Sequence, residues 1–186
     1  MSDHVRIFCL RHAEADTTFG GGGRVNPAAP LTPRGRDQAA SAAATFRGVA
    51  VDGVYDSTAV RSRDTAAAVA RVVGADPVPM PGLLEADVDA ATLRAWIVDR
   101  DLSARAEDGE TGADVAARVT AALTAIADRH PGGTVAVVGH VASLTVGLSE
   151  LCGLGGTVWG RPLPHAVPFL VERRGDTWTC TSWPGP

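Results

Sequence analysis

Short runs of apolar and β-branched residues recur along the chain and predict the strands of an α/β fold. The first run, at residues 5–12, passes directly from apolar side chains into an Arg-His pair. Another, at residues 134–138, is apolar without alternation, which is typical of a strand covered on both faces. The remaining expected strands are residues 51–55, 77–79, 167–171 and 177–182, and its prolines make the 77–79 piece an edge strand or an irregular segment.

Helical patterns separate most of these runs. Thr32 and Pro33 suit the N-cap and first position of a helix that continues to about residue 46. The strongest helical pattern covers residues 114–129, where apolar residues recur at three- and four-residue spacing. Other helices are expected to end near residue 73 and to cover residues 91–98 and 141–151. Four glycines at residues 20–23, followed by prolines, predict a surface flap.

Composition narrows the class of protein. A chain of 186 residues with 45% hydrophobic and 20% charged residues suits one globular domain. The net charge of -4 gives no reason to expect nucleic acid or an anionic membrane as a partner. No apolar stretch approaches 18 residues, and the beginning of the chain has no long apolar segment, so we expect a soluble cytoplasmic protein.

The basic residues and cysteines exclude several kinds of chemistry. All 17 basic residues are arginine, which excludes a P-loop and a lysine Schiff base. Because arginine takes the place of lysine throughout the chain, an isolated arginine is weak evidence of function. The three cysteines are widely spaced and form no C-x-x-C pair, so neither a zinc site nor a disulfide framework is indicated.

Polar groups follow three of the expected strands, at the points where those strands end. They are Arg11 with His12, Ser57 with Arg61 just inside the next helix, and His140. If the strands are parallel neighbours, these groups converge beyond one edge of the sheet, where α/β proteins bind ligands. Two guanidiniums and two imidazoles near a helix N-terminus suit a dianionic tetrahedral group such as phosphate.

A phosphate at this site could be transferred to an imidazole. A neutral imidazole can attack phosphorus and form a phosphohistidine, which water later hydrolyses. The acid for the leaving oxygen is expected to be Glu85, which stands directly after an apolar pair; Asp87, Asp89 and Glu110 are the acidic alternatives.

Several segments carry motifs in a fixed order: Leu10-Arg11-His12-Ala13-Glu14, Leu31-Thr32 with Gly35 and Gln38-Ala39, Ser57 with Arg61 and Thr65-Ala66, Leu83-x-Glu85, Gly109-Glu110-Thr111, and Val138-Gly139-His140. Together they resemble the motifs of the histidine phosphatase superfamily, also called phosphoglycerate mutase-like. The resemblance implies a three-layer α/β/α sandwich with a mostly parallel central sheet. It also implies one such domain over residues 1–186, with residues 85–112 as a partial lid.

The resemblance assigns roles by position. It implies that His12 is the nucleophile, that Arg11, Arg61 and His140 bind the phosphoryl group, and that Ser57 belongs to the same phosphate-binding set. Glu85 would protonate the leaving alkoxide and then activate water. The fixed cations would stabilise the developing charge, so neither a metal nor a cofactor is expected.

Departures from the motifs concern the subfamily rather than the chemistry. Ala13 replaces a glycine, Thr58-Ala59 replaces proline-leucine, and residues 141–143 replace a glycine-rich turn. His165 stands where an asparagine is frequent, so it is a further pocket candidate. The roles of Arg24, Arg161 and Glu110 stay open.

The leading hypothesis is a metal-independent phosphatase that hydrolyses a small phosphorylated metabolite through a phosphohistidine. A phosphoglycerate mutase is an alternative, although mutases of this type usually run longer. A phosphohistidine protein phosphatase is another, although such relatives often lack the acid that Glu85 would supply. A non-catalytic phosphate-binding module is the fourth, although every reacting group is present. Neither the substrate nor the oligomeric state follows from the sequence.

Overall fold

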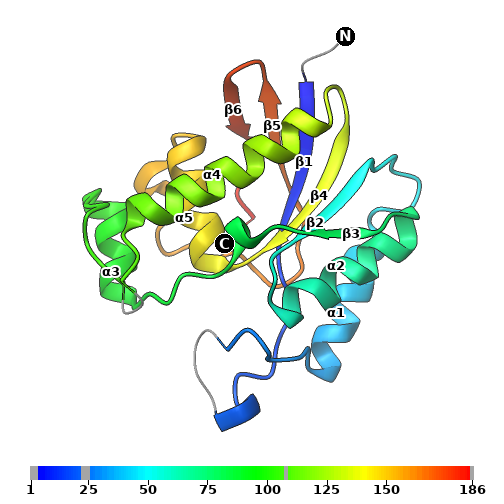
Figure 1. Cartoon of the computed structure of the whole chain (residues 1–186), viewed down its shortest axis with the longest axis horizontal. Coiled ribbons are helices and arrows are strands. Elements are labelled where there is room, and N and C mark those ends of the chain that lie inside the picture. Colours follow the sequence, from blue (N-terminus) through cyan, green and yellow to red (C-terminus); the bar gives the residue numbers. More distant parts are fainter. Residues whose placement is uncertain (1–3, 22–25, 107–108, 185–186) are drawn as a thin grey trace.

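The structure, a computed structural model, describes residues 4–21, 26–106 and 109–184. Its centre is a six-stranded sheet in the order β3-β2-β4-β1-β5-β6 (Figure 1). The strands are β1 (His4–Arg11), β2 (Gly53–Asp56), β3 (Pro77–Pro79), β4 (Thr134–Gly139), β5 (Phe169–Arg174) and β6 (Thr177–Cys180). Strands β1 to β4 are mutually parallel, and β5 is antiparallel to both of its neighbours. The predicted mostly parallel sheet, with residues 77–79 at its edge, is confirmed.

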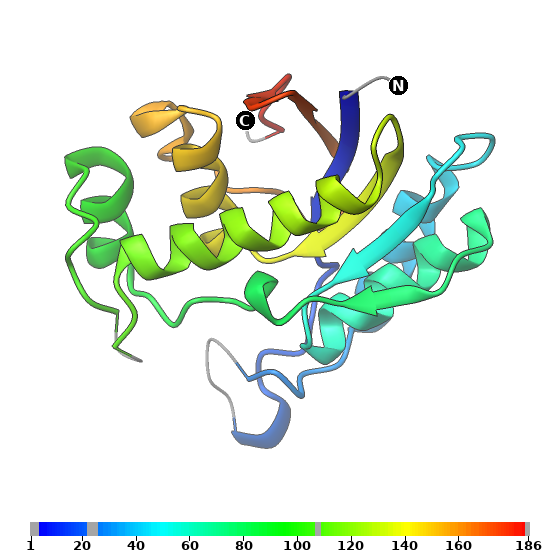
Figure 2. The ribbon, with the colours of Figure 1, turned by 45° about the horizontal axis from the view of Figure 1, so that its top comes forward.

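Helices cover both faces of the sheet, as expected for the three-layer sandwich (Figure 2). Helices α1 (Pro33–Ala44) and α2 (Val60–Val73) pack on one face, and α4 (Gly112–Arg129) and α5 (Val141–Leu151) lie on the other. The shorter elements are η1 (Phe19–Gly21), η2 (Pro81–Leu83), α3 (Ala90–Arg94), η3 (Ala95–Asp99) and η4 (Gly155–Val158). None of the helices in the described ranges is both long and apolar enough to cross a bilayer.

The apolar pattern of the strands explains why the sheet has a hydrophobic core on each of its two faces. Every residue of β4 is buried, because helices cover the sheet on both sides. Alternate residues of β1 then face opposite layers: Cys9 packs with the α4 and α5 side, whereas Leu10 packs with the α1 and α2 side. Parallel pairing joins Leu10 to Val138 and Arg11 to Gly139, so β1 and β4 end at the same edge of the sheet. This shared edge positions the polar residues that follow each strand.

The helix expected over residues 91–98 differs in the structure. It consists of α3 and then a wider π-helical turn, η3, which ends at Arg100 with φ 55°. Trp96 lies in this turn, is fully buried, and donates from Nε1 to the carbonyl of Ala104 at 2.8 Å. The turn thus places a large buried side chain and its hydrogen bond to a distant carbonyl, neither of which sequence periodicity reports. The role of residues 85–112 as a lid stays a prediction.

Candidate functional site

Strand β1 delivers the proposed nucleophile to the shared edge of the sheet. The backbone N–H of His12 donates to the carbonyl of Gly139 at 2.9 Å, which continues the pairing with β4 by one residue. The Nδ1 atom of His12 lies 2.7 Å from the carbonyl oxygen of Ala13, which can only accept, so Nδ1 carries the hydrogen. The Nε2 atom therefore keeps a lone pair.

Helix α2 brings the first cation to this lone pair. The Nε–H of Arg61 donates to Nε2 of His12 at 3.1 Å, and Nη1 of Arg61 donates to the carbonyl of Asn26 at 2.7 Å. Burial, with the positive charges of Arg61 and Arg11, lowers the pKa of His12 to about 3. His12 is accordingly neutral over the whole physiological range, as a nucleophilic imidazole must be.

Arg11 supplies a second guanidinium from the last position of β1. Its Nη1 donates to the carbonyl of Leu163 at 3.1 Å, and its buried Nε has no partner among the residues that the structure describes. An unpaired buried donor of this kind costs free energy unless a ligand satisfies it. Arg11 is thus suited to receive an anion beside His12.

His140 follows β4 and approaches the nucleophile from the side of α5. Its ring centroid lies 5.0 Å from that of His12, and its side chain is fully buried. Burial, with the charges of Arg61 and Arg11 contributing, lowers the pKa of His140 well below its ordinary value. Its Nε2 lies 2.6 Å from Oγ of Ser57, whereas its Nδ1 is without a partner within the described ranges.

Ser57 holds this second imidazole in place. Its side chain is fully buried and bonds to His140, and neither residue is among those lining the adjoining cavity. The contact makes Ser57 an orienting residue for His140. Its role as a direct phosphate ligand stays a prediction.

Glu85 lies across the cavity at the N-terminus of α5. One carboxylate oxygen accepts from the backbone N–H groups of Ser143 (2.9 Å) and Ala86 (3.1 Å), and the other accepts from Ala142 at 3.2 Å. Burial raises the pKa of Glu85 above its ordinary value, although these N–H groups and Arg61 oppose the rise. The carboxyl group is therefore fixed in position and is easier to protonate than a free glutamate.

A cavity of about 450 Å³ brings together four of these residues, and it lies in the region where β1, β2 and β4 end. Arg11, His12, Arg61 and Glu85 all line it, and so does His165. The Nδ1 of His165 donates to the carbonyl of His12 at 2.9 Å, so this candidate belongs to the pocket wall. The other lining residues are Glu14, Ala15, Asp16, Thr17, Asn26, Ala29, Thr32 and Val141.

The loop after His12 is fastened to α1 and α2. Thr32 caps α1, accepting from the N–H of Gly35 at 2.9 Å and donating its hydroxyl to Glu14 at 2.8 Å. Any Cβ on Gly35 would stand 2.0 Å from the carbonyl oxygen of Glu14, so only glycine fits there. Thr65 accepts from the N–H of Ala13 at 3.0 Å. The Leu-Thr-x-x-Gly and Thr-Ala segments of the sequence thus position the pocket wall.

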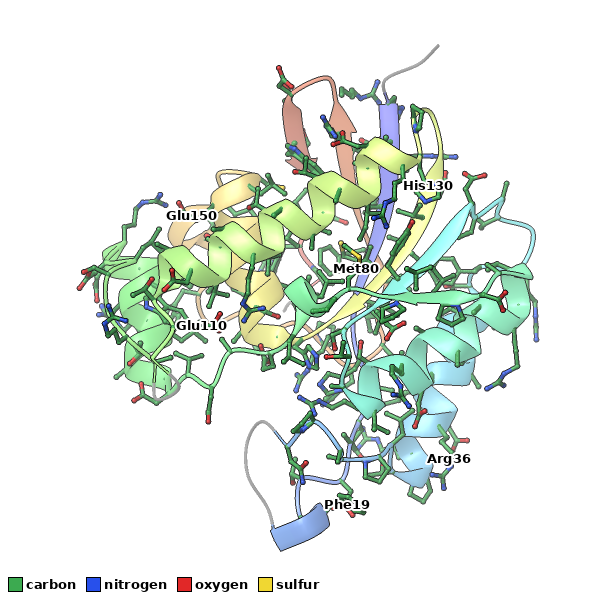
Figure 3. All side chains as sticks on the ribbon, in the orientation of Figure 1. Phe19, Arg36, Met80, Glu110, His130 and Glu150 are labelled. Atoms are coloured by element: carbon green, nitrogen blue, oxygen red, sulfur yellow. The ribbon has the colours of Figure 1, made fainter. Side chains whose placement is uncertain are left out.

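Other candidates from the sequence lie elsewhere. Glu110 forms a paired contact with Arg118, at 2.7 and 2.9 Å, which in turn binds the carbonyls of Gly82 and Leu84. Figure 3 shows Glu110 near the beginning of α4, away from the loop that carries Phe19. Arg161 is not among the described residues that line the cavity, and Arg24 falls outside the described residues.

Sequence reasoning missed the groups that hold the arginines. The carbonyls of Asn26 and Leu163 are backbone atoms, which have no signature in a sequence. Glu14 and Asp16 were also not identified as pocket residues, although they directly follow the Arg-His pair. Within the described ranges, no group of three or more His, Cys, Asp or Glu residues is placed to hold a metal ion.

The sequence profile of the histidine phosphatase superfamily (branch 1) matches residues 7–184. The chain belongs to this superfamily. Among curated relatives, a probable phosphoglycerate mutase of Cronobacter sakazakii is 25% identical over 193 residues, covering 96% of this chain and 90% of the relative.

Solved structures of phosphatases share the fold. A mycobacterial glucosyl-3-phosphoglycerate phosphatase superposes with a TM-score of 0.80 at 21% identity, covering 98% of this chain and 100% of that one. An alpha-ribazole phosphatase from Shigella flexneri gives a TM-score of 0.74 at 21% identity, covering 96% and 95%. The superfamily and the fold expected from the motifs are both confirmed.

Proposed function

We propose that this protein is a metal-independent phosphatase that hydrolyses a small phosphate monoester through a phosphohistidine. One observation carries the proposal: the lone pair of His12 Nε2 faces Arg61 in a cavity that Glu85 also lines. This cavity holds a nucleophile, an anion-binding cation and a carboxyl group with a raised pKa, which are the three groups that the reaction needs. The names of the phosphatases with the same fold agree with it.

The reaction proceeds in two steps. First, Nε2 of His12 forms a bond to phosphorus while the bond from phosphorus to the ester oxygen breaks, and Glu85 gives its proton to that oxygen. Water then attacks phosphorus, Glu85 takes its proton, and the bond from Nε2 to phosphorus breaks. Arg11 and Arg61 neutralise the oxygens of the transferred group, so charge stabilisation comes from fixed protein cations.

The first experiment measures hydrolysis of p-nitrophenyl phosphate with a chelator present, between pH 5 and 7. We expect turnover by the wild type and a loss of about a thousandfold or more in His12→Ala, because the covalent route is removed. His4→Ala is the matched control, since His4 lies at the opposite end of the same strand. Undiminished turnover by His12→Ala, or turnover abolished by the chelator, would contradict the proposal.

The covalent step can be tested separately. Brief incubation with ³²P-labelled substrate and an alkaline quench should leave label on the wild-type chain, and acid should release it, as expected for a phosphoramidate. His12→Ala should retain none. Label that survives acid would indicate a different nucleophile.

A mutase is the second candidate, because the curated relative named above carries that description at 25% identity. It predicts exchange between 2- and 3-phosphoglycerate that depends on a bisphosphoglycerate primer. A hydrolase instead releases inorganic phosphate from the same mixture. Measuring both products in one reaction decides between them.

A further inference from the structure

The acid of the proposed reaction lies in a stretch without regular secondary structure. Glu85 follows the single turn η2 and precedes α3. Its carboxylate accepts from the N–H groups of Ala142 and Ser143, in the first turn of α5. A helix offers no internal partner to its first N–H groups, so these bonds depend on where the carboxylate lies. They fix the end of the side chain but not the main chain that carries it.

Arg118 of α4 binds the main chain directly before Glu85. Its Nη1 donates to the carbonyl of Leu84 at 2.6 Å and to the carbonyl of Gly82 at 3.0 Å. Hydrogen bonds from a charged donor are about twice as strong as those between neutral groups. Arg118 therefore holds the segment before Glu85 against α4, although the two parts of the chain are more than thirty residues apart.

Glu110 fixes the orientation of this guanidinium. One carboxylate oxygen of Glu110 accepts from Nε of Arg118 at 2.7 Å, and the other accepts from Nη2 at 2.9 Å. A bidentate pair holds a planar guanidinium in one orientation, so Nη1 is directed at the two carbonyls. Neither Glu110 nor Arg118 is among the described residues that line the cavity of about 450 Å³. The pair is therefore placed to support the acid rather than to bind the substrate.

Close backbone packing holds the same segment a second time. Turn η2 lies against α4 (Figure 1), and a Cβ on Gly82 would stand 2.8 Å from the carbonyl oxygen of Arg118. That distance is too short for a real Cβ, so glycine is required for this approach. Leu83, the next residue, is fully buried in the core on the α4 side of the sheet. A guanidinium and a glycine thus both set the path of the chain into Glu85.

We propose that Arg118, oriented by Glu110, is a positioning residue that keeps the carboxyl group of Glu85 at the oxygen of the leaving group. This inference rests on the proposed phosphatase function. An acid must lie within hydrogen-bond reach of the oxygen that it protonates, and a displacement of about 1 Å can cost about a hundredfold in rate. Loss of the Arg118 contacts should remove the contribution of the acid while leaving the nucleophile and the phosphate-binding arginines in place.

The first test compares two leaving groups in Arg118→Met, which keeps an unbranched apolar side chain but removes the donors. Glycerol 3-phosphate releases an alkoxide that must be protonated, whereas p-nitrophenyl phosphate releases a stable phenolate. We expect kcat to fall about tenfold or more on glycerol 3-phosphate but less than about threefold on p-nitrophenyl phosphate, with little change in either KM. Equal losses on the two substrates would overturn the proposal, because they would indicate a general structural defect.

Two further variants accompany this comparison. Arg129→Met is the matched control, because Arg129 is an exposed arginine in the last turn of the same helix, and it should leave both kcat values unchanged. Gly82→Ala pushes the same segment away from α4 without removing a charge, so it tests the proposal even if Arg118→Met does not fold. It should also lower kcat more on glycerol 3-phosphate than on p-nitrophenyl phosphate. An unchanged ratio of the two kcat values would contradict the proposal.

A double mutant shows whether Arg118 acts through the acid. In a Glu85→Gln background the acid is already absent, so Arg118→Met should cause no further loss of kcat on glycerol 3-phosphate. A further loss as large as that in the wild-type background would show that Arg118 acts independently of Glu85.

Hydrogen exchange separates this inference from the proposed function, because it needs no turnover. In Arg118→Met the N–H groups of Ala142 and Ser143 should exchange about fivefold faster or more, as they lose their carboxylate partner, and Arg129→Met should not change them. If the wild type hydrolyses neither substrate but exchange is accelerated, the phosphatase function fails and the positioning of Glu85 stands. If the wild type is active and Arg118→Met changes neither exchange nor the kcat ratio, only the positioning fails.

Discussion

At the scale of single residues, burial sets opposite protonation states on the two sides of the cavity. It lowers the pKa of His12 to about 3, because the charged imidazolium is the form that loses hydration. It raises the pKa of Glu85, because there the charged form is the carboxylate. One environment thus favours a neutral base and a neutral acid near each other.

This arrangement predicts the pH dependence of kcat for an alkyl phosphate. Glu85 must hold its proton to protonate the alkoxide, so kcat should decline as the pH rises through its raised pKa. Glu85→Gln should lower kcat about 10²- to 10³-fold on an alkyl phosphate and abolish this decline. On p-nitrophenyl phosphate, whose leaving group needs little protonation, the loss should be smaller.

The control for this prediction is Glu150→Gln, a change near the far end of the helix whose N-terminus holds Glu85. This change should leave kcat unaltered on both the alkyl phosphate and p-nitrophenyl phosphate. Equal losses on the two substrates for Glu85→Gln would show that the carboxyl group only supports the structure.

At the scale of elements, the sequence motifs position the pocket wall by capping a helix and by allowing close backbone packing. The Thr32 cap and the contact of Gly35 with Glu14 could be anticipated from the sequence, because capping residues and glycines have local causes. The carbonyl that binds Arg11 could not, because Leu163 lies 152 residues away along the chain and contributes only its backbone. The sequence predicts that the polar residues converge only if their strands are parallel neighbours. The pairing of β1 and β2 with β4 meets that condition.

The close contact between α4 and α5 gives a prediction in which two effects oppose each other. A Cβ on Gly147 of α5 would lie 2.3 Å from Cγ1 of Val119 on α4. Helix propensity favours Gly147→Ala by about 1 kcal/mol, but the overlap should cost about 1–3 kcal/mol or more in a buried core. We expect net destabilisation, measured by urea unfolding.

A double mutant isolates the contact. Val119→Ala removes Cγ1 but keeps Cβ, which would stand 2.6 Å from the new methyl group. Gly147→Ala should therefore cost less in that background than in the wild type, without becoming neutral. Additive losses would show that the contact with Cγ1 of Val119 contributes nothing to the cost of Gly147→Ala.

At the scale of the whole molecule, the site joins parts of the chain that are remote in sequence. Arg11 ends β1 and His12 follows it, Arg61 comes from α2, Glu85 from the segment after η2, and His140 directly follows β4. An anion bound among them would link separate parts of the fold. Binding to the folded chain alone must then raise its thermal stability.

Orthovanadate at about a hundred times its Kd should raise Tm by about 5–10 °C, which corresponds to about 2.7 kcal/mol for a chain of this size. Arg61→Ala should lose most of this shift. Arg63→Ala, an exposed arginine on the same helix, should keep it. A full shift in Arg61→Ala, measured by scanning calorimetry, would remove that residue from the anion site.

The central position of β1 also bears on synthesis of the chain. Its partners in the sheet are β4 and β5, so Arg6 pairs with Thr134 and Phe8 with Leu170. A nascent chain on the ribosome therefore carries the Arg-His pair long before either neighbouring strand has been translated. Catalytic competence would then arise only near the end of translation, so termination after His140 but before β5 would yield polypeptides that contain every motif yet remain inert.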